Sequence, residues 1–200
     1  MTIDALGEIT RKKGLTYPEY LQKTIEEIAN TDVSLLDENA LEKFNFKKLN
    51  LHRSSRIEKT YKVSEELKSE IQKINNPQLW MILSETWCGD SAQNIPHLYL
   101  MAAHNPNIDV RMILRDSNPD IMDKYLTNGT RSIPILIALD NEGNELFRWG
   151  SRPKAGQDLV NELKAQGLEK KQWQEKLHLW YARNRGAEIE KEILEILRKM

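Results

Sequence analysis

The chain has 200 residues, of which 40% are hydrophobic and 30% charged, so it can bury the core of one domain with additions. Its net charge of −1 gives no reason to expect a nucleic acid or an anionic membrane as a partner. The single cysteine, Cys88, excludes an internal disulfide and a cysteine-rich metal site, and the four histidines form no compact ligand motif. We therefore expect no metal and no cofactor.

The N-terminal sequence predicts a cytoplasmic protein. The first ten residues lack the basic region and apolar core of a signal peptide. No apolar run approaches the roughly 20 residues that a membrane span requires. A reducing compartment would keep Cys88 as a free thiol that is available for exchange.

The first 44 residues predict two helices. One covers residues 14–30, with Thr16 as its N-cap and Pro18 in its first turn. A second, shorter helix covers Ser34 to Phe44 and places its leucines and Phe44 on one side.

Residues 45–61 are basic, with three lysines and two arginines. We interpret this segment as a solvated connector. An alternative is that Arg53 or Arg56 reaches the surroundings of Cys88 and stabilises an anion there. A nucleic-acid surface fits poorly, because the charge is balanced over the chain and aromatic residues do not interleave with the basic ones.

Residues 64–104 predict a helix, a buried strand and a second helix. Ser64 is the N-cap of a helix that ends near Ile74. The apolar run 79–83 indicates a buried strand. A helix follows from Ser91 to about His104, bent at Pro96.

Cys88 lies between this strand and this helix, where a thiolate is favoured. The first N–H groups of a helix have no intrahelical partner, and the helix dipole adds roughly half a positive charge. As an N-cap, Cys88 would accept from the N–H of Ser91, and the Ser91 hydroxyl would add a second donor. Asp90 acts in the opposite direction, because its carboxylate raises the cost of a nearby thiolate. The alternative is that Cys88 is an ordinary buried residue.

The rest of the chain alternates strands and helices. The expected elements are a strand over Ile108–Leu114, a helix from Asn118 to Leu126 capped by Asn128-Gly129, a strand after Pro134, a hairpin into Glu145–Trp149 and a helix over Ala155–Gln166. Residues 169–199 predict further helix, with Gly186 as a break. This last segment either packs across the core or forms a contact with a second copy or a partner.

Two motifs resemble thioredoxins. Trp87-Cys88-Gly89-Asp90-Ser91 is similar to the active-site segment Trp-Cys-Gly-Pro-Cys, with serine at the second cysteine and aspartate in place of proline. Pro96 matches the proline that kinks the next helix, and Arg131-Ser132-Ile133-Pro134 resembles the segment with the cis proline. The longer resemblance, which includes residues 49–56, is to bacterial thioredoxin family proteins with one active-site cysteine.

This resemblance implies an α/β thioredoxin-like fold, with a mixed central sheet flanked by helices and an antiparallel hairpin at one edge. It implies a thioredoxin-like domain at residues 77–167. Residues 1–76 would form an N-terminal helical extension and connector, and residues 168–200 a long C-terminal helical extension packing on the core.

The resemblance also implies a site. Cys88 would be the nucleophile and Ser91 its stabiliser. A cis Ile133–Pro134 bond would offer backbone groups to an extended peptide. The implied substrate-binding residues are Trp87, Gly89, Asp90, Ile133 and Pro134. Among the other tryptophans, Trp80 and Trp149 are expected in the core.

The chain departs from the thioredoxin pattern in ways that bear on activity. Thioredoxins carry a buried aspartate six residues before the cysteine, where this chain has Ile82. Glu85 is either a substitute proton acceptor or, as we expect, a solvated loop carboxylate. Without a second cysteine, Cys88 cannot resolve a mixed disulfide internally. The predicted function is monothiol thiol–disulfide exchange with an external resolving thiol, on a protein or a low-molecular-weight substrate.

A second class of function remains open, a non-catalytic binding module that uses the peptide groove and the terminal helices. Those helices also offer a surface for a homodimer. A non-redox enzyme that pairs Cys88 with His97 or His104 ranks third, because both histidines are expected on the far side of the helix from its N-terminus.

Overall fold

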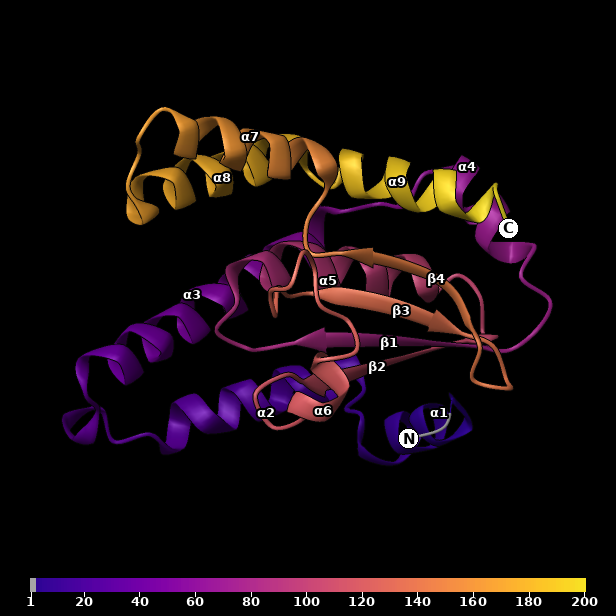
Figure 1. Ribbon diagram of the computed structural model, residues 1–200, viewed down its shortest axis with the longest axis horizontal. Helices are drawn as coiled ribbons and strands as arrows, with labels where there is room; N and C mark the ends of the chain where they lie inside the picture. The colour runs from indigo at the N-terminus through magenta and orange to yellow at the C-terminus, as the bar shows by residue number, and fades with distance from the viewer. Residues whose placement is uncertain (1–2) are drawn as a thin grey trace.

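The computed structural model describes residues 3–200, in which a central sheet has helices on both of its sides (Figure 1). The helices are α1 (Ile3–Lys13), α2 (Tyr17–Asn30), α3 (Glu38–Thr60), α4 (Glu65–Gln72), α5 (Gly89–Ala102), α6 (Pro119–Met122), α7 (Lys154–Ala165), α8 (Lys170–Asn184) and α9 (Ala187–Leu197), with a 3₁₀ turn at Val33–Leu35. The strands are β1 (Gln78–Ser84), β2 (Ile108–Leu114), β3 (Ile135–Leu139) and β4 (Glu145–Gly150). None of these helices is long and apolar enough to cross a membrane.

The four strands form one mixed sheet in the order β2-β1-β3-β4. β1 runs parallel to β2 and antiparallel to β3, so that Trp80 lies between Val110 and Ala138. β3 and β4 form the antiparallel hairpin at the edge. The predicted thioredoxin-like architecture, with helical additions before and after it, is confirmed.

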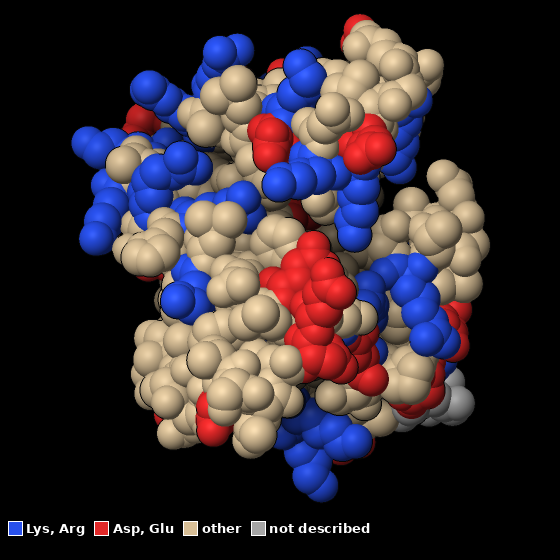
Figure 2. Space-filling model, turned by 90° about the vertical axis from the view of Figure 1, so that its left-hand side faces the viewer, with Lys and Arg blue, Asp and Glu red and all other residues tan. Residues whose placement is uncertain are grey.

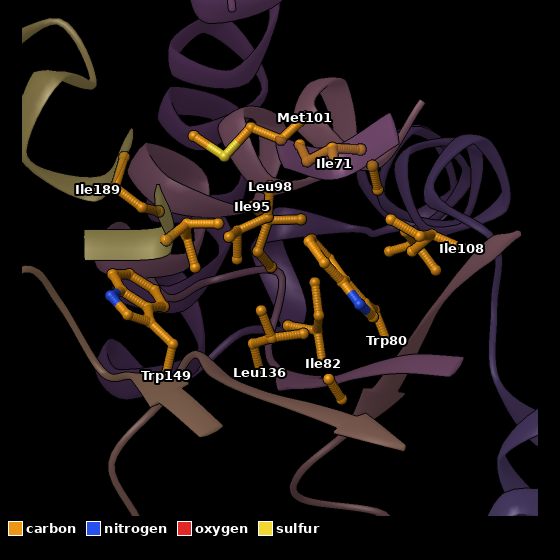
Figure 3. Close-up of a cluster of buried hydrophobic side chains, with 14 of the residues drawn as sticks. Ile71, Trp80, Ile82, Ile95, Leu98, Met101, Ile108, Leu136, Trp149 and Ile189 are labelled. Carbon is orange, nitrogen blue, oxygen red and sulfur yellow. The ribbon is translucent and has the colours of Figure 1, made fainter. Parts of the chain in front are cut away.

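β1 is buried along its whole length because both faces of the sheet are covered. Trp80 and Ile82 point to the face covered by α4, α5 and α9, towards Leu98 (Figure 3), and Ile189 of α9 belongs to the same buried cluster. The alternate residues of β1, such as Met81, pack on the other face against α1 and α6. Because β1 is held on both faces, its C-terminal end fixes the position of the loop that contains Cys88.

The prediction for residues 34–61 is wrong in one respect. Most of the short helix predicted over Ser34 to Phe44 and of the connector over 45–61 is one continuous helix, α3 (Glu38–Thr60), with Asp37 as its N-cap. The segment contains no proline or glycine after the cap, so nothing ends the helix early. Its apolar stripe is weak because two of its buried positions are the polar residues Asn50 and Ser54.

These two polar residues attach α3 to α5. Pro96 lies inside α5 and has no N–H, so the carbonyl of Ala92, four residues earlier, loses its helical partner. The Ser54 hydroxyl donates to that carbonyl at 3.5 Å. Asn50 Nδ2 donates to the Thr86 carbonyl at 3.0 Å, in the loop before α5. The segment predicted as a connector is thus part of the support of the site.

Two smaller predictions also need correction. The helix expected from Asn118 to Leu126 is a single turn, α6, and the Asn128-Gly129 pair forms a separate turn beyond it, closed by a bridge between Thr127 and Thr130. Helix α1 was not predicted.

The C-terminal segment is two helices, as the position of Gly186 suggests. Arg185 and Gly186 have φ of 53° and 88°, which ends α8 and turns the chain into α9. A Cβ at Gly186 would lie 2.4 Å from the ring of His97. The turn therefore requires glycine both for its positive φ and for the space beside His97. In Figure 1, α8 and α9 run along the top of the view, above α5 and the sheet. Ile189 and Ile193 of α9 are buried in the cluster that includes Trp80, and Leu177 and Tyr181 of α8 are buried with Val160 of α7.

Candidate functional site

Cys88 is the N-cap of α5 and follows the end of β1 by a short loop. Its N–H donates to the Glu85 carbonyl at 3.0 Å, and its carbonyl accepts from the Ala92 N–H at 3.1 Å. Its sulfur makes no capping hydrogen bond but donates to the Ile133 carbonyl at 3.4 Å. The Ile133–Pro134 bond is cis. The two motifs that are 46 residues apart in the sequence are thus in direct contact.

The thiol of Cys88 is deeply enclosed, with 8% of the residue exposed. Burial raises the pKa of Cys88 to about 11, and the Asp90 carboxylate adds to the increase. The Ser91 side chain and the backbone amides of Ser91 and Asp90 favour the thiolate, but they do not offset burial. The features at the start of α5 that favour a thiolate are therefore outweighed, and the resting side chain is a thiol at neutral pH.

Asp90 is held by groups from α8, from the loop before α7 and from its own helix α5. Arg152 Nη2 contacts one carboxylate oxygen at 2.5 Å, and the Tyr181 hydroxyl donates to the other at 2.7 Å. Asn94 Nδ2 donates both to the Asp90 carbonyl, at 2.8 Å, and to the Tyr181 hydroxyl, at 3.0 Å. Burial acts to lower the pKa of Arg152, but the Asp90 carboxylate outweighs it and raises that pKa. The first turn of α5 is consequently fixed to the C-terminal part of the chain.

Ser91 occupies the position of the second thioredoxin cysteine and is almost fully buried. Its hydroxyl has no hydrogen-bond partner within the described residues. It therefore remains available as a donor to the sulfur of Cys88.

A pocket of about 380 Å³ opens over Cys88. Helix α3 contributes Lys43 and Phe46 to its walls, and α8 contributes Trp173 and His178. Figure 2 faces the end of the molecule where α3 and α8 begin; Lys and Arg side chains gather in its upper part, and an acidic cluster lies at the centre. Of the predicted substrate-binding residues, Trp87, Gly89 and Asp90 line this pocket.

The residues that sequence reasoning missed come from the C-terminal part of the chain: Arg152, His178 and Tyr181. A Cβ on Gly89 would lie 2.8 Å from the His178 ring and 3.3 Å from Arg53 Nη1, so glycine is needed for their approach. Burial lowers the pKa of His178 to about 3, and Arg53 and Arg152 contribute to the decrease. No local signal identifies these residues, because their contact with the Cys88 loop arises only when α8 folds over α5.

The structure shows which arginine of residues 45–61 lies near Cys88. Arg53 reaches the Cys88 loop through its approach to Gly89. Arg56 instead lines a separate pocket together with His97 and Arg185. Arg53 therefore lies beside the Cys88 loop, whereas Arg56 lines a cavity away from it.

Other expectations concern acids and tryptophans around the site. Glu85 is buried and not solvated, and one of its carboxylate oxygens accepts from the Asp116 N–H at 2.7 Å. Burial raises the pKa of Glu85. Ile82, Trp80 and Trp149 are core residues. Glu85 thus faces the end of β2, and it is not the exposed loop carboxylate that we expected.

His97 is not a partner of Cys88. Its Nδ1 lies 2.9 Å from the Gln93 carbonyl, and its ring stands edge-on to Tyr61. Within the part of the chain that the structure describes, no group of three His, Cys, Asp or Glu side chains is placed to hold a metal.

His97 makes the stability of the protein depend on pH. Burial lowers the pKa of His97 to about 4 from the ordinary 6.5, so the unfolded chain binds its proton first and folding weakens as the pH falls from 6.5 towards 4. The loss at pH 4 is roughly 3 kcal/mol. In urea unfolding at pH 7 and pH 4, His97→Gln should reduce the pH-dependent difference by about this amount. His52→Gln, at an exposed position of α3, should not change it.

We compared the chain with protein-family models, with curated proteins and with solved structures. Residues 38–164 match the family model described as Thioredoxin, a segment that begins with α3 and ends within α7. No curated protein matches. A crystal structure of a Pseudomonas aeruginosa protein of unknown function is similar at a TM-score of 0.57 and 17% identity, over 92% of this chain and 98% of that one. An HIV epitope-scaffold is similar at a TM-score of 0.57 and 18% identity, over 93% and 99% of the two chains. Since the family model covers more than half of the sequence, the chain belongs to the thioredoxin family.

Proposed function

We propose that the protein carries out thiol–disulfide exchange by a monothiol route through Cys88. The observation that carries this proposal is the position of the sulfur, at the head of α5, 3.4 Å from the Ile133 carbonyl next to Pro134 and beneath an open pocket. A substrate sulfur that enters the pocket would meet the one thiol of the chain there.

The exchange takes two steps. The Cys88 thiolate attacks a disulfide R–S–S–R, a bond forms between Sγ and one substrate sulfur, and RS⁻ leaves and takes up a proton. An external thiol then attacks the substrate sulfur of the mixed disulfide as its thiolate. The Cys88 thiolate leaves and is protonated, so the protein is regenerated and the external thiol ends in a disulfide with the substrate.

The raised pKa sets the expected speed of both steps. With a pKa of about 11, Cys88 is almost entirely a thiol at pH 7, so attack is slow. A thiol of high pKa is also a poor leaving group, so external thiol releases Cys88 slowly. The proposed protein is therefore a slow exchanger that keeps its substrate as a mixed disulfide for a long time.

The burial of the Cys88 sulfur also supports a second candidate function. A buried thiol with a raised pKa suits a non-catalytic binding module, in which Cys88 packs in the core beside Met81. A partner would then bind to the groove or to the terminal helices without any covalent step.

A neutral disulfide separates the two candidates. We expect native protein incubated with 2-hydroxyethyl disulfide at pH 8 to gain one hydroxyethylthio group, measured by intact mass. Cys88→Ser should gain none, and added dithiothreitol should remove the group.

The urea-unfolded chain is the control for the chemistry of the reagent. If the unfolded chain reacts while the native protein does not over the same hours, the exchange proposal is wrong and the binding module stands.

A further inference from the structure

We infer that the pocket over Cys88 selects a small thiol or disulfide that carries carboxylate groups. This inference rests on the proposed exchange function and names the substrate class of the same site. Three features support it, namely the cations at the pocket, the cover that α8 places over the cysteine, and the aromatic walls.

Cations without acidic partners surround the pocket. Lys43 and Lys170 line it, and neither forms a salt bridge with any described residue. Arg53, beside Gly89, is half-buried, donates to the Asn50 side chain and forms no salt bridge with any described residue, although the Asp90 carboxylate acts on it electrostatically. Asp90 is already bound by Arg152, so a ligand carboxylate would give Arg53 a direct partner.

Arg152 adds a further positive charge to the pocket wall. Its Nη2 is bound by Asp90 and its Nη1 donates to the Gln157 side chain at 3.1 Å, while its Nε is buried and has no hydrogen-bond partner within the described residues. The guanidinium is therefore held at the pocket by both of its terminal nitrogens.

Helix α8 restricts what reaches the cysteine. Its His178 ring lies against Gly89, and its Trp173 and Leu177 line the pocket wall. A folded protein that approached Cys88 from this side would meet α8 first. A volume of about 380 Å³ lies at the small end of the range for pockets that hold small molecules.

The walls combine aromatic faces with charge. The Trp87 ring has Lys43 at 5.2 Å on its face and Arg115 at 5.0 Å. Together with Trp173, it provides apolar surface for the carbon chain of a ligand whose ends are charged. The pocket thus suits a flexible thiol with a hydrocarbon backbone and acidic ends.

Two acidic residues also line the pocket. The Asp90 carboxylate is already bound by Arg152 and Tyr181. Glu42 forms no salt bridge within the described residues and opposes an anionic ligand. Glu42→Gln should accordingly strengthen anion binding, while substitutions at the lysines weaken it.

Three disulfides of similar size test the inference. We would use 3,3′-dithiodipropionate with two carboxylates, 2-hydroxyethyl disulfide with no charge, and cystamine with two ammonium groups. Binding to Cys88→Ser is measured by calorimetry, where no covalent step is possible, and the rate of mixed-disulfide formation is measured with the wild type. Each rate is divided by the rate of the same disulfide with the urea-unfolded chain, because the leaving thiols differ in pKa. We expect the dicarboxylate to bind, and on this relative scale to react, about threefold to tenfold better than the neutral compound, and cystamine to be worst.

Matched variants locate the charge. Lys43→Gln and Lys170→Gln should each weaken dithiodipropionate binding to the Cys88→Ser protein about twofold to fivefold. Lys48→Gln and Lys171→Gln, on the same helices but outside the pocket, should leave it unchanged. The difference between pocket and control lysines should shrink at high salt.

The outcomes separate this inference from the proposed function. If the three disulfides react at equal relative rates and bind equally, the charge selection is wrong and the exchange stands. If none reacts but Cys88→Ser binds the dicarboxylate through Lys43 and Lys170, the pocket assignment stands and the exchange is wrong. Preference for cystamine, or equal losses in pocket and control variants, would overturn the inference.

Discussion

Replacing Asp90 with asparagine should speed the alkylation of Cys88 by iodoacetamide at pH 8. After burial, Asp90 is the largest cause of the raised pKa of this thiol. The substitution removes a negative charge near the sulfur and leaves the positive charge of Arg152 in place. Losing the negative charge and keeping the positive one both favour the thiolate, so the pKa of Cys88 should fall from about 11.

The size of the effect follows from two opposing dependences. Each unit by which the pKa falls gives about ten times more thiolate at pH 8, while the intrinsic nucleophilicity drops with a Brønsted slope of about 0.4–0.5. The net gain is about threefold per unit, so a fall of one to two units gives a threefold to tenfold faster reaction. The measurement is the pseudo-first-order rate of carbamidomethylation, followed by mass spectrometry across a series of pH values.

Asp123→Asn is the matched control, because Asp123 is an exposed carboxylate paired with Arg131 at 2.7 Å, away from the site. It should leave the alkylation rate unchanged. If Asp90→Asn also leaves it unchanged, burial alone sets the pKa and the Asp90 carboxylate has no electrostatic influence on the sulfur. Unfolding curves of both variants show whether a faster reaction reflects local opening.

The parts of the fold that the sequence predicts well have local signals. The apolar run before the cysteine gives β1, the apolar run at Ile108–Leu114 gives β2, and the caps Thr16 and Ser64 begin α2 and α4. The contact between Cys88 and the Ile133 carbonyl was accessible only through resemblance, because two motifs 46 residues apart meet by tertiary folding.

The parts that could not be predicted depend on burial and on long-range contacts. A helix N-terminus favours a thiolate, and this reasoning holds, but it cannot reveal how much of the sulfur other elements cover. Tyr181 and His178 reach the first turn of α5 from α8. The apolar stripe of α8, which includes Trp173, Leu177 and Trp180, packs with Val160 of α7, so it does not reveal this docking. Likewise, α3 was misjudged because it attaches through Asn50 and Ser54, which are polar.

One departure from the thioredoxin motif, Asp90, is in contact with residues from the C-terminal part of the chain. Where thioredoxins have proline, this chain has Asp90, and a carboxylate at that buried position requires compensation. The compensation comes from Arg152 and Tyr181, which lie outside the motif. The substitution in the motif and the C-terminal helices are therefore parts of one arrangement, in which the site is closed on one side and its electrostatics are set by distant residues.

This arrangement predicts that Arg152→Met will destabilise the fold by about 2–3 kcal/mol, measured by urea unfolding at pH 7. Removing one partner of a buried ion pair leaves the other charge uncompensated, at a cost of roughly 3–5 kcal/mol when burial is complete. Here the side chains of Arg152 and Asp90 are 15% and 12% exposed, so water reduces the penalty. The variant should also slow the alkylation of Cys88, because a positive charge near the sulfur is lost.

The double variant Asp90→Asn/Arg152→Met identifies the cause of that loss. If an uncompensated Asp90 carboxylate is responsible, neutralising it should recover part of the stability, and the double variant should be more stable than Arg152→Met alone. If the loss comes from packing around the methylene groups of Arg152, the two substitutions should add. Arg131→Met, which breaks the exposed pair with Asp123, should cost no more than about 0.5 kcal/mol. Equal losses in Arg152→Met and Arg131→Met would mean that the ion pair behaves as a surface pair, and Asp90 would then not depend on the C-terminal half of the chain for its stability.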